Sequence, residues 1–172
     1  VAQAAHHATH RTAFQKKLVD QPLMANVLAD MAIEAEAAMR LALRLGRAYD
    51  SGEAAFARLM TPAAKYWVCK RGPTLAAEAM EVLGGNGYVE EAIMARIYRE
   101  MPVNSIWEGS GNVMCLDVLR ALARAPRSLA AYMAELAPAR GADARLDAAI
   151  AELERALADP AEAEARARYL TE

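Results

Sequence analysis

Small and apolar residues recur at alternating spacings of four and three positions from Met24 to Tyr49. A seam of this kind follows one side of an α-helix and is typical of helices that pack lengthwise against other helices. Pro22 precedes the seam, where proline is tolerated because its missing N–H has no helical partner. Asp-Ser-Gly at residues 50–52 ends it. We therefore predict one long helix of an antiparallel bundle. The seam consists of Met24, Leu28, Met31, Ala35, Ala38, Ala42, Leu45 and Tyr49.

Composition extends this prediction to the whole chain. Hydrophobic residues make up 55% of the 172 residues, whereas aromatic residues make up only 6%, and alanine supplies the excess. Alanine favours helices and lets them approach closely. A chain of this length forms one domain with an appendage and buries a core without disulfides or metal. We expect an all-α protein.

Proline and glycine positions predict where further helices begin and end. Thr61 is expected to cap a helix over residues 63–83 that starts with Pro62, after a short helix over residues 53–60. Gly72-Pro73 should kink that helix without ending it. Further helices are expected over residues 1–17, 90–100 and 112–124. Because the first of them opens without a cap, we expect the chain to be part of a longer protein.

The expected inward faces follow from helical spacing. In the helix over residues 112–124 this face comprises Val113, Leu116, Leu119 and Ala123. Pro138, Gly141 and Pro160 should divide the tail into three helices. The middle tail helix has an apolar seam of Leu146, Ile150, Leu153 and Leu157.

Several classes of protein are disfavoured by the sequence. Cys69 and Cys115 are the only cysteines and lie far apart, so neither a disulfide framework nor a zinc site is expected, and a reducing, cytoplasmic setting follows. His6 and His10 have the spacing of a metal clamp but no nearby carboxylate or thiolate, so a solvated helix face is favoured and no metal is expected. No apolar run is long enough to span a bilayer. The net charge of -2 gives no global attraction to nucleic acid.

A functional corner is predicted between residues 81 and 117. Gly84, Gly85 and Gly87 permit positive φ and allow backbone amides to approach a ligand. Glu108 stands beside Trp107 at the entrance of a helix, where a carboxylate is able to act as a base. The alternative is that Glu108 is an ordinary acid favoured by the helix dipole.

Basic residues form two weaker signals. Lys65, Lys70 and Arg71 are either a solvated helix face near the kink, which is favoured, or a contact for an anionic ligand. Arg11 and Phe14 lie one helical turn apart and suit a phosphate next to a ring, although the pair alone is weak evidence.

Taken together, these residues resemble a known family. The motifs are Arg-Thr-Ala-Phe at residues 11–14, Leu-Ala-Asp-Met-Ala at 28–32, Leu-Gly-Gly-Asn-Gly-Tyr at 83–88, and Tyr98-Arg99 followed by Ile-Trp-Glu-Gly-Ser at 106–110. In this order and spacing they resemble the C-terminal helical domain of the acyl-CoA dehydrogenase flavoproteins over residues 1–124. The resemblance implies an up-and-down four-helix bundle over residues 1–125 and a helical C-terminal extension over residues 126–172.

The resemblance also implies partners and roles for individual residues. It implies missing N-terminal and middle domains, a homotetramer or dimer of dimers, and FAD shared with a neighbouring subunit. Glu108 matches the catalytic base that removes the α-proton of an acyl-CoA thioester, and Gly109 lies at the substrate. The cofactor contacts implied are Arg11, Thr12, Phe14, Glu81, Gly84, Gly85, Ser110 and Asn112.

Some positions depart from the usual family pattern. Trp107, Ser110 and Glu81 stand where tyrosine, threonine and glutamine are common. The run at residues 98–122 and the Lys-Arg-Gly-Pro kink resemble the alkylation-response (AidB-like) branch. Its members keep FAD, show feeble dehydrogenase activity and are associated with DNA binding and protection against alkylation damage.

The sequence is therefore compatible with three functions. The first is an FAD-dependent acyl-CoA dehydrogenase domain, and the second is a DNA-associated flavoprotein that contacts double-stranded DNA through Lys65, Lys70 and Arg71. The third is an assembly module, because the chain alone lacks two domains that would enclose FAD. In that case we expect it to be colourless, inactive, helical and oligomeric.

Overall fold

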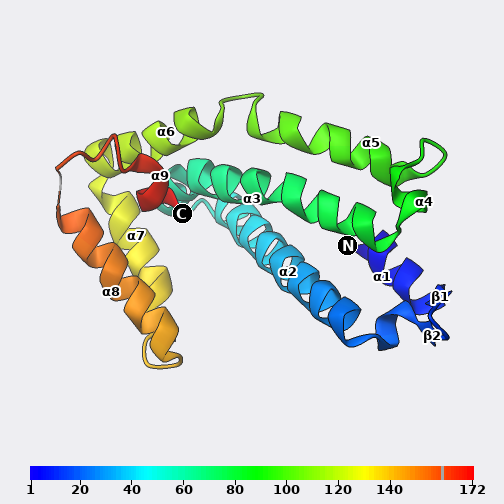
Figure 1. The fold of residues 1–172 in the computed structure, drawn as a ribbon. Coiled ribbons are helices and arrows are strands. Elements are labelled where there is room, and N and C mark those ends of the chain that lie inside the picture. The colour runs from blue at the N-terminus through cyan, green and yellow to red at the C-terminus, as the bar shows by residue number, and fades with distance from the viewer. Residues whose placement is uncertain (160) are drawn as a thin grey trace. The chain divides into compact units, whose positions relative to one another are not determined.

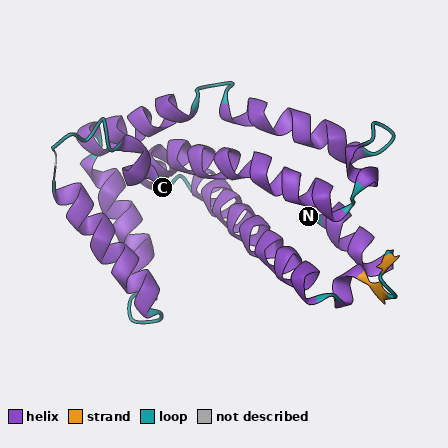
Figure 2. Cartoon of the chain, in the orientation of Figure 1, coloured by secondary structure: helices purple, strands orange, loops and turns teal. Residues whose placement is uncertain are grey.

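The computed structural model describes residues 1–159 and 161–172. Helices make up most of this part of the chain, and its strands are confined to one short hairpin (Figure 2). The chain forms two compact units. The first unit comprises Val1–Ala42 and Val68–Trp107, and the second comprises Leu43–Trp67 and Glu108–Glu172. The all-α prediction is thus confirmed.

The first helix is shorter than predicted and gives way to a hairpin. α1 (Ala2–His10) ends where the N–H of Arg11 donates to the carbonyl of His7. β1 (Thr12–Ala13) then pairs with antiparallel β2 (Lys16–Lys17). The turn residues between the strands have φ values of 51° and 65°, as a type I′ turn requires. The prediction of helix through residue 17 is therefore wrong, because local turn and strand bonds replace helical ones.

Two long helices follow a single 3-10 turn, η1 (Leu18–Asp20). α2 (Pro22–Asp50) begins and ends as the sequence predicts (Figure 1). α3 (Ala54–Val82) is one uninterrupted helix of 29 residues, so the predicted break at Thr61 is wrong. The Thr61 hydroxyl does not cap a new helix and donates instead to the carbonyl of Ala57, at 2.7 Å. Pro62 is buried within the helix.

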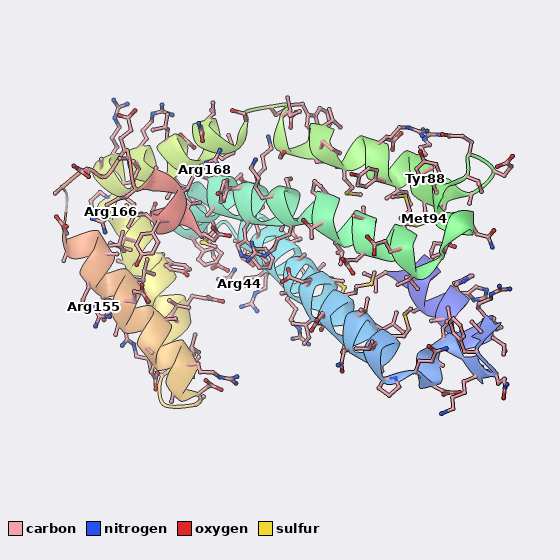
Figure 3. The ribbon with its side chains drawn as sticks, in the orientation of Figure 1. Arg44, Tyr88, Met94, Arg155, Arg166 and Arg168 are labelled. Carbon is pink, nitrogen blue, oxygen red and sulfur yellow. The ribbon has the colours of Figure 1, made fainter. Side chains whose placement is uncertain are left out.

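The first compact unit is built around small side chains. α4 (Gly85–Tyr88), α5 (Ile93–Glu100) and η2 (Met101–Ser105) follow α3. Met94 of α5 is buried and Tyr88 is 76% exposed (Figure 3). The buried residues of this core are Ala4, Ala8, Met31, Ala79, Val82 and Met94. Alanines on α1 and α3 allow the close approach that the composition predicts.

The second compact unit contains the tail. Its helices are α6 (Gly111–Arg124), α7 (Pro126–Leu136), α8 (Ala144–Ala158) and α9 (Ala167–Thr171), with the 3-10 turn η3 (Ala137–Ala139) after α7. α7 and α8 lie side by side (Figure 1). The Asp143 side chain caps α8 by accepting the N–H groups of Arg145 and Leu146. Pro160, a predicted tail breaker, lies outside the described residues.

The predicted inward faces are only partly correct. On α6 the buried residues are Gly111, Cys115, Val118 and Ala121, whereas Val113 is 49% and Leu116 is 38% exposed. Ala123 is exposed as well. α6 carries apolar residues on more than one side, so the helices it packs against decide which side faces inward. On α2, likewise, Ala48 is fully buried and Tyr49 is 62% exposed, which reverses the predicted seam there.

An arginine fixes α7 within this unit (Figure 3). The guanidinium of Arg44 on α2 donates to both carboxylate oxygens of Glu135 on α7, at 2.6 and 2.8 Å. It also donates to Glu53 at 2.7 Å and lies 4.1 Å from the centre of the Phe56 ring. The hydrogen bonds that Arg44 donates to Glu135 and Glu53 raise its pKa. The tail is therefore held by charge-assisted bonds in addition to apolar packing.

Candidate functional site

Glu108 lies in a short, conformationally unusual loop that leads into α6. Its φ is 54°, and Gly109 follows with a φ of 114°. A non-glycine residue in this region is uncommon and is held there by its surroundings. The side chain of Glu108 is exposed. We call Glu108, Gly109 and Ser110 the acid loop.

A lysine from another helix holds the acid loop. Nζ of Lys65 on α3 donates to the carbonyl oxygen of Gly109 at 2.8 Å. At Gly109 itself, a side chain would come within 2.4 Å of Cε of Met114 and would be strained at that φ. The backbone next to Glu108 is therefore fixed by one charged donor and by a position that favours glycine.

Ser110 and Asn112 stand at the first turn of α6. Ser110 is its N-cap residue but makes no side-chain capping bond. Oδ1 of Asn112 accepts a hydrogen bond from Nε of Arg168 on α9, at 2.8 Å. The start of α6 therefore presents an exposed hydroxyl, while Asn112 joins α6 to α9.

The glycines of residues 84–87 play different structural roles. Gly84 is exposed and has a φ of 61°. Gly85 is exposed, and a Cβ there would meet no atom within 4 Å. Gly87 is buried, and a Cβ there would lie 2.2 Å from the carbonyl oxygen of Met80. Gly84 thus supplies the turn. The sequence predicted that these glycines let the backbone approach a ligand, but at Gly87 the backbone instead lies close to α3. Glu81 is exposed at the end of α3.

The hairpin groups three of the predicted cofactor residues. Arg11, Thr12 and Phe14 are all exposed, and the Phe14 ring at the tip is 91% exposed. Gln21 supports the strand beneath them, because its Nε2 donates to the carbonyl of Ala13 at 3.0 Å. A cation, a hydroxyl and an accessible ring on one small element suit an anionic ligand that also carries an aromatic ring.

The predicted site residues therefore form two groups, one in each compact unit. The first unit contains Arg11, Thr12, Phe14, Glu81, Gly84 and Gly85. The second contains Glu108, Gly109, Ser110 and Asn112.

The predicted basic residues have acidic or backbone partners. Lys65 is used by the acid loop, and Nε of Arg71 lies 3.2 Å from Oε2 of Glu34. Lys70 is exposed. Lys70 and Arg71 line a cavity of about 400 Å³ together with three acids, Asp30, Glu34 and Glu78. Acids beside these bases reduce their attraction for an anion.

Arg120 on α6 forms an ion pair. Its Nη1 donates at 2.7 Å to Asp117 of the same helix, α6. Asp117 also accepts two bonds from Arg58 of α3, at 2.8 and 3.0 Å. The hydrogen bonds from Arg58 lower the pKa of Asp117 most, and the bond from Arg120 lowers it further. Sequence spacing gave no sign of the link between Arg58 and Asp117.

Asp117→Asn should destabilise the protein more at neutral pH than in acid. Because the folded-state pKa is lowered, the carboxylate contributes stability above its unfolded pKa of about 3.9, and this is lost as pH falls through the folded value. We expect a loss of about 1 kcal/mol at pH 7 for a partly exposed pair. Urea unfolding at pH 7 and pH 3 measures it. An equal difference from wild type at both pH values would contradict the assignment.

His6 and His10, the spaced histidine pair on α1, lie next to each other. The rings of His6 and His10 stack with centroids 4.3 Å apart. Among the residues described, no three His, Cys, Asp or Glu side chains form a group suited to a metal ion. None of the described helices combines the length and apolar character needed to cross a bilayer.

The chain is similar to known proteins along most of its length. Residues 1–123 match the family model described as "Acyl-CoA dehydrogenase, C-terminal domain". The "Putative acyl-CoA dehydrogenase AidB" of Escherichia coli K12 is 50% identical over 163 residues, 92% of this chain and 30% of that protein. "Acyl-CoA dehydrogenase family member 11" of Caenorhabditis elegans is 32% identical over 140 residues, 77% of this chain and 23% of that protein.

Solved structures agree with these relatives. A structure titled "Caenorhabditis elegans ACDH-11 in complex with C11-CoA" matches with a TM-score of 0.84 at 25% identity, over 98% of this chain and 33% of that one. The apo form of Bd2924 matches with a TM-score of 0.77 at 30% identity, over 98% of this chain and 34% of that one. The chain thus spans about a third or less of each of these proteins.

Proposed function

This chain belongs to the acyl-CoA dehydrogenase family, and from that premise we propose that it is the C-terminal helical part of an FAD-dependent acyl-CoA dehydrogenase. The observation that carries the proposal is the acid loop. Glu108 is exposed, its backbone is held in a rare conformation, and Lys65 fixes the next carbonyl. A general base needs this combination of access and fixed position.

The proposed chemistry is the α,β-oxidation of an acyl-CoA thioester. The Glu108 carboxylate takes the proton from the α-carbon, and the remaining electron pair forms the new double bond as the β-carbon loses a hydride. When bound, FAD supplies the acceptor for that hydride. Gly109 lies beside the base and would meet the substrate through its backbone, because Met114 fills the space where a side chain would stand.

The residues of the first unit fit a flavin nucleotide. Arg11 and Thr12 are exposed and able to meet a pyrophosphate, and Phe14 offers an accessible ring. Gly84 and Gly85 leave the backbone open to the adenine end, and Glu81 lies next to them. In the second unit Ser110 has a hydroxyl that no cap bond uses. Arg168 bonds to the side-chain oxygen of Asn112, so Asn112 would contact the cofactor through its amide NH2 group.

We extend the proposal to the partners of the chain. N-terminal and middle domains would enclose FAD, and a homotetramer would share it between subunits. Within the chain, residues 1–125 would form the bundle and residues 126–172 its extension.

The test of the proposed function is anaerobic bleaching of flavin by short or branched acyl-CoA in a polypeptide that joins this chain to those domains. Absence of bleaching would overturn the proposal, and a yellow, flavin-bound preparation of the 172 residues alone would contradict the need for the other domains.

Double-stranded DNA is the second candidate ligand, in a protein that protects against alkylation damage. It is supported by the exposed Lys70 and by the resemblance to the AidB-like branch. The internal partners of Lys65 and Arg71 count against it. We therefore favour the dehydrogenase function over the DNA-binding function.

Lys65→Met separates the two candidates. If Lys65 positions the acid loop, its loss should lower the rate of flavin bleaching by about 10- to 100-fold, and Lys65→Arg should restore most of it. Salt-dependent duplex binding should not change. The measurements are bleaching kinetics and duplex titration at several salt concentrations. A weaker salt dependence with an unchanged bleaching rate would favour DNA contact instead.

A further inference from the structure

The second compact unit contains an apolar cavity that the acid loop does not touch. It has a volume of about 470 Å³ and is formed by α3, α6, α7, α8 and α9. Aliphatic side chains from these helices line most of it, among them Leu59, Val118, Leu129, Ile150 and Leu153. All of its lining from α7, α8 and α9 lies beyond residue 123, where the family match ends. The cavity is therefore largely a property of the extension.

The size of the cavity suits a small molecule better than a protein segment. A helix with its side chains is roughly 10 Å wide, so about four residues of it would fill 470 Å³. A partner helix would therefore enter the cavity only with its end or with a few side chains. Small-molecule sites, in contrast, span roughly 300–1,000 Å³ and are mostly apolar.

The apolar lining also indicates what should occupy the cavity. Aliphatic side chains around a hollow lose dispersion contacts, and an apolar guest that enters the hollow restores them and removes apolar surface from water. The seam of α8 that the sequence predicts, including Ile150 and Leu153, faces this cavity. An occupant would supply the contacts that these side chains lack.

The polar groups of the cavity select against an anion. Its charged lining residues are Glu152 and Glu172, and neither lysine nor arginine is among them. The Tyr169 hydroxyl donates to Oε1 of Glu152 at 2.6 Å and so joins α9 to α8 at the rim. Burial raises the pKa of Tyr132 in the lining, so this hydroxyl stays protonated as a donor. Arg155 and Arg166 act on the Tyr169 hydroxyl from outside the lining. The lining itself has two carboxylates and no basic residue, so it favours an alcohol or ester over a carboxylate.

We propose that this cavity is a binding site for an uncharged aliphatic molecule of medium chain length with one hydrogen-bonding group. The site is separate from the acid loop, so it does not depend on the proposed dehydrogenase activity. Ala149 lines the cavity and is exposed, so a larger side chain is tolerated there without disturbing the core. Ala148 precedes it on α8, is exposed and is absent from the lining.

The test is calorimetric titration of the chain with 1-octanol and with octanoate. We expect saturable binding of one octanol per chain, and at least about tenfold weaker binding of octanoate, a difference of roughly 1.4 kcal/mol. Ala149→Phe should weaken octanol binding at least about tenfold, whereas the matched control Ala148→Phe should leave it unchanged. Circular dichroism verifies that both variants keep their helices.

Three results would overturn the proposal. Non-saturating uptake, or equal binding by both variants, would mean surface partitioning. Octanoate binding as tightly as octanol would refute the assignment to an uncharged ligand. Absence of octanol binding, together with self-association that Ala149→Phe abolishes, would assign the cavity to a second copy of the chain.

Discussion

Glu108→Gln is expected to lower the rate of flavin reduction by acyl-CoA by roughly two to four orders of magnitude, the usual contribution of a general base. Glutamine has nearly the same shape but cannot accept the α-proton. The backbone of the acid loop should survive, because the bond from Lys65 goes to the carbonyl of Gly109 and not to the Glu108 side chain. The measurement is stopped-flow bleaching under anaerobic conditions, in a polypeptide that also contains the N-terminal and middle domains.

Glu164→Gln is the matched control. Glu164 is also exposed and also loses one negative charge on substitution, but it belongs to the tail and not to the acid loop. Its rate should equal that of the wild type. Equal, slow bleaching by wild type and Glu108→Gln would exclude Glu108 as the base, even if the flavin is bound normally.

Gly87→Ala should be the most destabilising single methyl addition in the first compact unit. The new Cβ would lie 2.2 Å from the carbonyl oxygen and 2.9 Å from the carbonyl carbon of Met80. Backbone atoms cannot rotate away as a side chain does, so α4 and α3 must separate. We expect a loss of about 3 kcal/mol, the upper end for overpacking, and a fall in Tm of roughly 6–12 °C. Thermal unfolding followed by circular dichroism measures it.

Gly85→Ala is the control for this clash. It adds the same methyl group two positions away, where no atom lies within 4 Å of the new Cβ and φ is not in the left-handed region. We expect its Tm to equal or slightly exceed that of wild type, because alanine favours the helix. If both variants unfold at the wild-type temperature, the close approach of Gly87 to Met80 is not present in solution.

Helix boundaries were predicted best where a residue imposes them chemically. Pro22 starts α2, and Gly52 follows its end with a φ of 69°, as the sequence indicated. Thr61-Pro62 carried the same kind of signal, yet α3 continues through it. The buried setting of Pro62 shows the reason: packing along a long helix outweighs one missing backbone bond.

The hairpin could not be found from local patterns. Phe14 and Gln15 both adopt positive φ. Turns of this type usually have glycine, asparagine or aspartate at these positions, so the sequence did not predict one here. A helix was predicted there because residues 1–10 are strongly helical and nothing at residue 11 breaks the pattern. The hairpin places Arg11, Thr12 and Phe14 together, which is also what their proposed common role requires.

For the candidate site, the sequence placed the acid at the entrance of α6 but missed the residue that holds it. Lys65 lies 44 positions from Gly109, and no spacing rule connects a lysine on one helix to a carbonyl that far along the chain. It was instead grouped with Lys70 and Arg71 as a surface charge. The catalytic and cofactor roles of the site residues stay predictions.

The amino-acid sequence by itself determined that the protein is helical, where α2 and α6 begin and end, and which family it belongs to, because these depend on local preferences and on ordered motifs. Only the tertiary structure decided which face of α6 is buried, that α3 is one helix, and that Lys65 holds the acid loop. The physical reason is that alanine-rich helices present several faces of similar hydrophobicity. Their burial is chosen by the neighbours they meet, and those neighbours are distant in sequence.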